Sequence, residues 1–493
     1  MPLARHGSQE LTQELLNQSG SEAVPLVVDL DGSLIRSDIL HESCVQLFAL
    51  QPLRIFQLPG WLARGKAALK TALADAVDLD VSQLPINESV LDFLRAEKAG
   101  GRRIILASAS HRRHVQAFAE HLGLFDGILA TEGEINLAGT SKARKLVEQF
   151  GTGGFDYIGD SDADIEVWRH ARHAYAVNPS AQLERKLRAI HPDAMLIRGE
   201  VPQARDYLRA LRPHQWAKNT LLFLPMLAAH AIAAESLLRL VPAFVGFCLV
   251  ASAVYLLNDL IDLSNDRDHH SKRLRPLASG AIPILHAALL CPALLAVGLA
   301  SAVFVSAPFL ALISAYFLLT TAYSLYLKRT AIIDAMALAG LYTLRVFAGA
   351  VVLDLPISPW MLAFCLFLFL SLALIKRYTE LDARARRRKT TIAGRGYLVD
   401  DMPLIEVLAG ASGYAAVVVL ALYVNAPVVS ALYLHPEGLW LICLLLLYWI
   451  SRILLLAHRG QMHEDPVVFA LKDRVSLITA LLCAVIVAAS SLQ

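Results

Sequence analysis

The sequence predicts an α/β domain followed by an all-α membrane domain. Of the 493 residues, 56% are hydrophobic and only 18% are charged, which is too apolar for an ordinary soluble enzyme. Residues 1–215 are mixed and charged, whereas most of the remainder consists of long runs of Leu, Ala, Val, Phe and Ile. Strand-like segments that end in acidic or hydroxyl residues recur in the first part. We therefore expect two domains, at 1–200 and 201–493.

Buried strands with polar ends define the first domain. The run PLVVDLDGSLIRSD is rich in β-branched residues and leads into an Asp-Gly-Ser turn, with Asp29 and Asp31 at the end of the strand. Similar strands end at Ser108 in RRIILASAS and at Asp160 and Asp164 in DYIGDSDAD. Helical stretches separate them, so we expect a Rossmann-like sheet with its chemistry at the carboxyl ends of the strands.

Four motifs, in order across residues 25–178, resemble those of the haloacid dehalogenase superfamily. They are DLDGS at 29–33, Ser108, Lys142 in NLAGTSKARKL, and GDSDAD at 159–164. The resemblance implies a phosphatase in which Asp29 attacks phosphorus and Asp31 acts as general acid and then general base. Ser108 and Lys142 would hold the phosphoryl oxygens. The implied Mg²⁺ ligands are Asp29, Asp31, Asp160 and Asp164, with a backbone carbonyl. Taken alone, DxDG also fits an Asp-Gly turn or a calcium loop.

A helical insertion follows the first motif, at about 34–97. It resembles the small helical cap that closes over the substrate in part of this superfamily. Trp61, Arg64 and Lys66 lie in the insertion and would either contact the substrate or serve packing and solvation.

Nine apolar stretches follow residue 217, each near the length of about 20 residues that spans a bilayer. Their approximate ranges are 218–234, 239–258, 285–306, 308–327, 332–353, 358–375, 404–425, 438–457 and 475–491. Basic residues gather in the loops after the even-numbered stretches, including the Arg-rich stretch 376–397, whereas the opposite loops hold only Arg239. This asymmetry predicts a multi-pass protein of the inner membrane with a cytoplasmic amino-terminal domain. The polar first twenty residues lack the apolar core of a signal peptide.

The loop after the second stretch, YLLNDLIDLSNDRDHHSKRLRPLASG, carries three aspartates. Asp259, Asp262 and Asp266 stand at i, i+3 and i+7, which predicts three carboxylates on one face of a helix. Three carboxylates on one face repel one another unless a cation lies between them. Mg²⁺ that bridges the carboxylates to a pyrophosphate would supply this positive charge. The neighbouring side chains that can bind the phosphates are Asn258, Lys272, Arg273 and Arg275. The alternative is a solvated acidic and basic loop beside the membrane.

The pattern NDxxDxxxD followed by KRxRPLASG resembles the first aspartate-rich motif of the UbiA superfamily, and the similarity covers roughly residues 205–491. The resemblance implies nine membrane helices, catalytic roles for Asp259 and Asp262, and Mg²⁺ held by Asp259, Asp262 and Asp266. The second motif should lie in KRYTELDAR, where Lys376, Arg377, Glu380 and Asp382 replace the usual DxxxD.

Three further segments resemble the branch that includes decaprenyl-phosphate phosphoribosyltransferase: LRPHQWAKN at 211–219, YSLYLKR at 323–329 and KRYTEL at 376–381. This resemblance implies that phosphoribosyl pyrophosphate and a polyprenyl phosphate are the substrates. Arg212, Lys218 and their neighbours Gln215, Trp216 and Asn219 would bind the lipid phosphate or anchor the chain at the interface. Further substrate-binding candidates are Tyr323, Lys328 and Arg345. Tyr323, Asp334 and Arg345 fall within or beside apolar helices, where ionisable groups are functional candidates, and the alternative is that they pair with one another.

These patterns together predict a bifunctional enzyme of cell wall biosynthesis that works on isoprenoid lipid in the bilayer. The membrane domain would transfer 5-phosphoribosyl to a polyprenyl (decaprenyl) phosphate, and the phosphatase would remove the 5-phosphate. The alternatives are an aromatic prenyltransferase of the same superfamily and a transporter or lipid-binding scaffold with a degenerate phosphatase domain. No basic stripe interleaved with aromatics indicates nucleic acid, and an oligomer is compatible with the sequence. The six cysteines show no pairing typical of disulfides or zinc.

Overall fold

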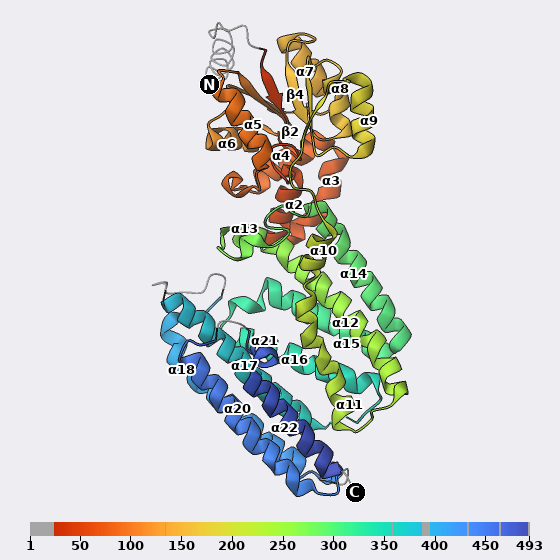
Figure 1. Cartoon of the computed structure of the whole chain (residues 1–493), viewed down its shortest axis with the longest axis vertical. Helices are drawn as coiled ribbons and strands as arrows, with labels where there is room; N and C mark the ends of the chain where they lie inside the picture. The colour runs from red at the N-terminus through yellow and green to blue at the C-terminus, as the bar shows by residue number, and fades with distance from the viewer. Residues whose placement is uncertain are drawn as a thin grey trace. The chain divides into compact units, whose positions relative to one another are not determined.

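The computed structural model describes residues 24–133, 135–356, 358–386, 395–430, 433–462 and 465–491. It divides into two compact units (Figure 1). The first unit contains the chain up to Leu211 together with Tyr255–Leu290, and the second contains Arg212–Val254 and Cys291 onward. The aspartate-rich loop therefore belongs to the first unit, although the sequence places it between apolar stretches. All six cysteines are free.

A six-stranded parallel sheet forms the centre of the first unit, in the order β3-β2-β1-β4-β5-β6. The strands are β1 Leu26–Val28, β2 Ile104–His111, β3 Gly127–Thr131, β4 Asp156–Gly159, β5 Ala174–Val177 and β6 Met195–Ile197. Because side chains alternate along a strand, Val28 packs on one face of the sheet and Val27 on the other. This confirms the predicted α/β fold.

Helices cover both faces of the sheet (Figure 1). The Val28 face packs against α5 Glu88–Ala99 and α6 Arg112–Leu122. The Val27 face packs against α7 Thr140–Phe150, α8 Ile165–Trp168 and α9 Ala181–Ile190. Both faces are thus removed from water, which is the usual arrangement for a parallel sheet.

A cap of short helices follows β1. It contains α2 Ile39–Leu50, η1 Pro52–Gln57, α3 Leu58–Ala63, α4 Lys66–Ala76 and η2 Val81–Gln83. Leu47, Leu73 and Val77 form a small apolar cluster there, and Trp61 packs against it, whereas Arg64 and Lys66 are exposed. The predicted range of 34–97 also includes α5, which packs on the sheet rather than in this cluster.

Among the described residues, seven helices are long and apolar enough to cross a membrane. They are α12 Ala234–Ile261, α14 Ile284–Val305, α15 Ala307–Leu325, α16 Ile333–Val352, α17 Pro359–Ala385, α18 Met402–Val424 and α20 Trp440–His458. The pair α21 Pro466–Lys472 and α22 Arg474–Ser491, bent by 78°, would be an eighth span. A multi-pass helical domain is confirmed, but the predicted number of nine is not.

The first predicted span, 218–234, has no long helix. The chain forms a 3₁₀ segment, η4 Pro213–Phe223, and then the five-residue helix α11 Leu224–Ala228. Pro213 and Pro225 each stand at the start of one of these short elements, where a missing N–H costs little. The apolar composition of this segment therefore predicted a longer helix than forms.

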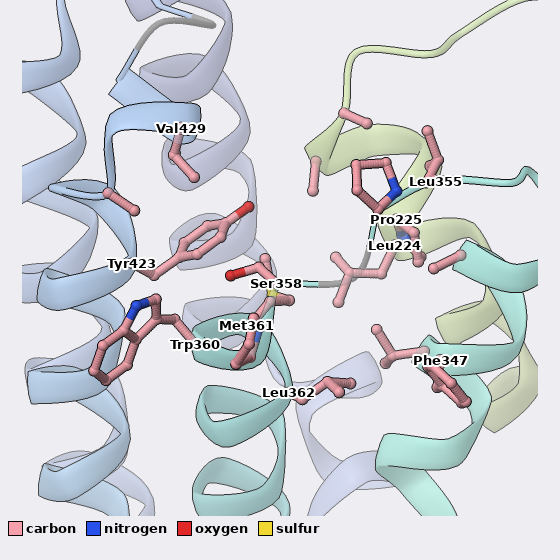
Figure 2. A pocket seen from close by; sticks show the side chains of 17 residues that line it. Leu224, Pro225, Phe347, Leu355, Ser358, Trp360, Met361, Leu362, Tyr423 and Val429 are labelled. Atoms are coloured by element: carbon pink, nitrogen blue, oxygen red, sulfur yellow. The ribbon is translucent and has the colours of Figure 1, made fainter.

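A cavity of about 440 Å³ lies in the second unit (Figure 2). Residues of α11, α16, α17 and α18 line it, including Pro225, Phe347, Trp360 and Tyr423. Figure 2 shows Trp360 and Tyr423 on one side and Leu224, Pro225 and Leu355 on the other. Its lining is predominantly apolar, as in sites for lipid or other apolar ligands.

Candidate active sites

The predicted residues of the first domain gather at one edge of the sheet. Asp29 and Asp31 follow β1, Ser108 lies in β2, and Asp160 follows β4. Because β1 lies between β2 and β4 and all three strands are parallel, their carboxyl ends meet. Gly32 has φ +77°, and an added Cβ would lie 2.3 Å from Asp160 Oδ2. The loop after Asp29 can therefore approach Asp160 only because residue 32 is glycine.

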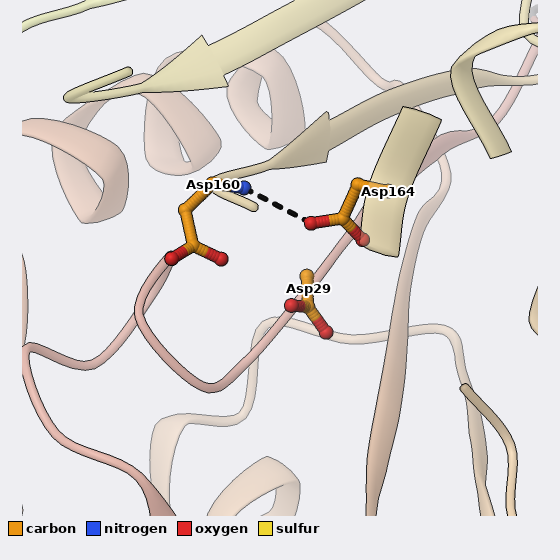
Figure 3. Close-up of side chains that lie close together, drawn as sticks. All are labelled: Asp29, Asp160 and Asp164. Carbon is orange, nitrogen blue, oxygen red and sulfur yellow. Dashed lines mark hydrogen bonds between the residues drawn. The ribbon is translucent and has the colours of Figure 1, made fainter. Parts of the chain in front are cut away.

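Asp29, Asp160 and Asp164 form an acidic cluster (Figure 3). Each offers an oxygen, and these oxygens lie within 4.8 Å of one another. The backbone N–H groups of Asp160 and Ser161 donate to Asp164 Oδ2 at 3.2 and 3.1 Å. Burial and neighbouring carboxylates raise the pKa of Asp29 to about 7 and that of Asp160 well above its usual value. Three crowded carboxylates are a suitable donor set for Mg²⁺.

Lys142 on α7 is buried beside this cluster. Its Nζ donates to Asp29 Oδ1 at 2.7 Å and to the Tyr157 hydroxyl at 3.0 Å. The Tyr157 hydroxyl in turn donates to Asp164 Oδ1 at 2.7 Å. Tyr157 thus links the lysine to a carboxylate of the cluster. Sequence reasoning missed this residue because DYIG resembles any buried strand.

Asp31 lies in a separate hydrogen-bond network. Ser108 Oγ and Ser110 Oγ donate to Asp31 Oδ2 at 3.0 and 2.7 Å, and the backbone N–H of Ile39 donates to Asp31 Oδ1 at 2.8 Å. The Asp31 carboxylate is not part of the acidic cluster of Asp29, Asp160 and Asp164. Burial, with the nearby Asp38 carboxylate, raises the pKa of Asp31. A carboxyl group that keeps its proton is suited to act as a general acid.

The aspartate-rich segment contains the end of α12, α13 Leu263–Asp268 and η5 Lys272–Leu274. Asp259 and Asp266 are buried, and Arg275 Nη1 contacts both, at 3.1 Å from Asp259 Oδ1. Lys272 Nζ lies 3.6 Å from Asp266 Oδ1, and Arg273 is exposed. The arginine therefore supplies part of the positive charge that this segment requires.

The prediction of one continuous helix face through the three aspartates is wrong. α12 ends at Ile261, and Asp262 adopts φ −93° and ψ 14° before α13 begins. Asp259 and Asp266 nevertheless both contact Arg275. In the described part of the chain, only Asp29, Asp160 and Asp164 are grouped closely enough for a metal ion. The Asn258 side-chain oxygen is buried with no hydrogen-bond partner among the described residues.

A second ionic cluster lies in the second unit, around Asp334 at the start of α16. Tyr323 donates its hydroxyl to Asp334 Oδ1 at 2.7 Å, and Arg395 Nη1 donates to the same oxygen at 3.0 Å. Arg377 Nε lies 2.5 Å from Asp334 Oδ2, and Arg377 Nη1 donates to Glu380 at 2.5 Å. Tyr323 and Asp334 thus pair with each other, as the alternative interpretation held. Residues 387–394 of the predicted Arg-rich stretch lie outside the described residues.

The remaining basic candidates have other partners. Arg345 is buried and donates to Asn219 Oδ1 and the Tyr316 hydroxyl, both at 2.9 Å. Lys218 and Lys376 converge on Asp465 Oδ2 at 3.1 and 2.7 Å. Arg212 is half-buried with φ +53°, and Lys328 is also half-buried. Trp216 donates to Ser252 Oγ at 3.0 Å.

Comparison with known proteins assigns both parts of the chain. The haloacid dehalogenase-like hydrolase family matches residues 26–169, and the UbiA prenyltransferase family matches residues 221–478. The chain belongs to the UbiA prenyltransferase family. Its amino-terminal domain is haloacid dehalogenase-like, so both resemblances drawn from the motifs are confirmed.

Relatives of this UbiA-family chain include one that shares most of its length. An uncharacterized protein, y4nM of Sinorhizobium fredii, is 39% identical over 457 residues, which cover 92% of this chain and 88% of that protein. The nodulation protein NoeC of Azorhizobium caulinodans is 38% identical over 280 residues, or 56% of this chain and 90% of NoeC. The decaprenyl-phosphate phosphoribosyltransferase of Mycolicibacterium smegmatis is 35% identical over 184 residues, or 36% of this chain and 58% of that enzyme.

Two charged residues of the UbiA-family part escaped sequence reasoning as site candidates. Arg395 contacts Asp334, and Asp465 holds Lys218 and Lys376. Their partners are 61, 247 and 89 residues away along the chain, so no local spacing indicates the contacts. The only feature of the sequence that could have indicated such a contact is the acidic side chain of Asp465. It lies in a loop whose basic residues were used to predict membrane orientation.

Proposed function

We propose that this chain transfers 5-phosphoribosyl from phosphoribosyl pyrophosphate to a polyprenyl phosphate and then removes the 5-phosphate from the lipid-linked product. The observation that carries the proposal is the cluster around Asp334. At the place of a second acidic motif, Arg377 and Arg395 neutralise Asp334 and Glu380. One acidic segment then remains for one pyrophosphate, and the partial identity to decaprenyl-phosphate phosphoribosyltransferase supports the same substrate pair.

In the transfer, the aspartate-rich segment binds the pyrophosphate of the sugar donor. Lys272, Arg273 and Arg275 bind phosphate oxygens, and Arg275 leaves Asp259 and Asp266 for the phosphates as they arrive. Mg²⁺, when bound by the carboxylates that Arg275 releases, supplies positive charge to the leaving group. A phosphate oxygen of the lipid attacks the anomeric carbon of ribose. The bond from that carbon to pyrophosphate breaks, and pyrophosphate leaves with the electron pair.

The haloacid dehalogenase-like domain then cleaves the 5-phosphate. Asp29 attacks phosphorus, the bond between phosphorus and the 5-oxygen breaks, and Asp31 gives its proton to that oxygen. Asp31 next takes a proton from water, which attacks the aspartyl-phosphate and releases inorganic phosphate. Lys142 orients Asp29 and offsets part of the negative charge of the phosphate. Asp29, Asp160 and Asp164 would hold Mg²⁺, which would supply further positive charge there.

The lipid substrate sets the cellular location in this proposal. The apolar cavity beside Trp360 and Tyr423 is a candidate place for part of an isoprenoid chain. The distribution of basic loops favours an inner-membrane protein with its phosphatase domain in the cytoplasm, where sugar phosphates are available.

The test is a transfer assay on purified protein with Mg²⁺, a polyprenyl phosphate and phosphoribosyl pyrophosphate labelled in the ribose. We expect labelled lipid from wild type and its loss by at least about 100-fold in Asp262→Asn, because transition-state charge stabilisation is lost. Lys186→Met, on the exposed face of the other domain, is the matched control and should keep full transfer. Absence of labelled lipid from wild type, with prenyl transfer from a polyprenyl pyrophosphate to an aromatic acid, would instead establish an aromatic prenyltransferase.

A further inference from the structure

Arg267 and Glu42 form a buried ion pair inside the first unit. Arg267 Nη2 donates to Glu42 Oε1 at 2.7 Å, and Arg267 Nη1 donates to Glu42 Oε2 at 3.0 Å, so the contact is bidentate. The two side chains are 8% and 3% exposed. Arg267 Nε also donates to the Ala278 carbonyl at 3.1 Å, and Ser37 Oγ donates to Glu42. A buried pair with this many partners fixes both of its elements, and removing one partner leaves an uncompensated charge.

The pair joins segments that match two different families. Glu42 lies on α2, within the haloacid dehalogenase-like residues 26–169, and Arg267 lies on α13, within the UbiA residues 221–478. An exposed rim surrounds the pair: Gln83 donates to Asp268 Oδ1 at 2.9 Å and accepts from Ser264 Oγ at 3.1 Å. The aspartate-rich segment is therefore docked on the phosphatase cap.

Each end of the pair lies close to a residue of a candidate site. The first residue of α2, Ile39, donates its N–H to Asp31, and Glu42 lies in the same turn of that helix. Arg267 directly follows Asp266, which Arg275 and Lys272 contact. A displacement of α13 would pass through Glu42 to the helix end that orients the Asp31 carboxyl group.

We propose that Arg267 is a positioning residue for Asp31 and that the Arg267–Glu42 pair couples the aspartate-rich segment to the phosphatase centre. The inference rests on the proposed function and adds that the position of α13 controls the phosphatase step. The phosphatase transfers a proton efficiently only while α13 holds α2. A misplaced general acid slows the departure of a basic alkoxide far more than that of a stable phenolate.

The test compares kcat/KM for two phosphate esters on the full chain in detergent with Mg²⁺. Ribose 5-phosphate needs a proton on its leaving oxygen, whereas p-nitrophenyl phosphate does not. The kcat/KM value covers substrate binding and formation of the aspartyl-phosphate but not its later hydrolysis. For Arg267→Met and Glu42→Gln we expect about a tenfold loss with ribose 5-phosphate and less than about threefold with p-nitrophenyl phosphate. The double variant should lose no more kcat/KM with ribose 5-phosphate than Arg267→Met alone, because both substitutions break the same ion pair.

Gln83→Ala is the matched control, because it removes rim contacts without breaking the ion pair, and it should keep the wild-type ratio of the two kcat/KM values. An unchanged ratio in Arg267→Met, or equal losses with both esters, would overturn the coupling. Should Arg267→Met not fold, Glu42→Gln, which keeps the side-chain shape, decides in the same way. If the wild-type protein cleaves neither ester, the phosphatase activity in the proposed function is ruled out. If the wild type cleaves both esters and Arg267→Met keeps the wild-type ratio, only the coupling is ruled out.

Discussion

At the scale of single residues, the phosphatase centre depends on how buried charges are paired. Asp29, Asp160 and Asp164 repel one another, and only Lys142 brings a positive charge into direct contact with the cluster in the described structure. Tyr157 shares its hydroxyl between Lys142 and Asp164. Burial keeps the pKa of Tyr157 well above its usual value, so the hydroxyl stays a donor. Tyr157 therefore orients both a carboxylate of the candidate metal site and the lysine that contacts Asp29.

Removing this hydroxyl should weaken Mg²⁺ binding while leaving the sheet intact. For Tyr157→Phe we expect the Mg²⁺ concentration at half-maximal phosphatase activity to rise about tenfold, because partners of metal ligands contribute about that much to affinity. A Mg²⁺ titration with p-nitrophenyl phosphate measures it. Tyr175→Phe, on neighbouring strand β5, is the matched control, since Tyr175 lies outside the cluster. Coincident titrations of wild type and Tyr157→Phe would refute this role.

The main residues of the candidate site could be predicted from the sequence, but the residues that hydrogen-bond to them could not. Asp29, Ser108 and Asp160 could be predicted because each lies at the end of a buried strand, and parallel neighbours bring such ends together. Tyr157 and Ser110 could not, because a tyrosine or serine in a strand carries no sign of the hydroxyl's partner. Lys142 was predicted from its place in the series of motifs, and its Nζ contacts Asp29 Oδ1.

At the scale of elements, the ionic cluster around Asp334 ties three helices together. Tyr323 comes from α15, Asp334 from α16 and Arg377 from α17. Asp334 and Arg377 are fully buried, so each charge depends on the other for compensation. This cluster therefore stabilises the packing of α15, α16 and α17 against one another.

Neutralising Asp334 should be costly. We expect Asp334→Asn to lower the free energy of unfolding by about 3 kcal/mol, because two guanidinium groups lose their shared carboxylate. Asp354→Asn is the matched control: it follows the other end of α16, and its exposed pair with Arg239 should contribute less than about 1 kcal/mol. Equilibrium unfolding in mixed micelles measures both variants. Equal stability of the two would show that the Asp334 cluster does not hold the helices.

Element boundaries were less predictable than element types. The long apolar stretches form helices, because in lipid a helix lets an apolar run of about 20 residues make all its backbone hydrogen bonds internally. The first stretch did not: it forms the end of η4 and the five-residue helix α11. Proline alone does not account for this, because α12 and α14 continue through Pro242 and Pro292. Likewise, α5 has the pattern of a surface helix, and only its contacts with the sheet separate it from the cap.

At the scale of the whole molecule, two families occupy one chain, and relative y4nM matches 92% of it. That alignment is too long to fit within either part alone, so the pairing of the two parts is shared with this relative. The aspartate-rich segment, part of the UbiA match, belongs to the same compact unit as the phosphatase. Such an arrangement is what consecutive action on one lipid-linked sugar would require.

The most direct test uses phosphoribosyl pyrophosphate with ¹⁴C in the ribose and ³²P in the 5-phosphate, given to the full chain with Mg²⁺ and polyprenyl phosphate. We predict that wild type yields lipid with ¹⁴C but no ³²P, together with free ³²P-phosphate. Asp29→Asn should yield lipid carrying both labels in equal amounts, because transfer continues while dephosphorylation stops. Lipid that keeps both labels in wild type, or that carries neither in any variant, would contradict consecutive transfer and dephosphorylation by this protein.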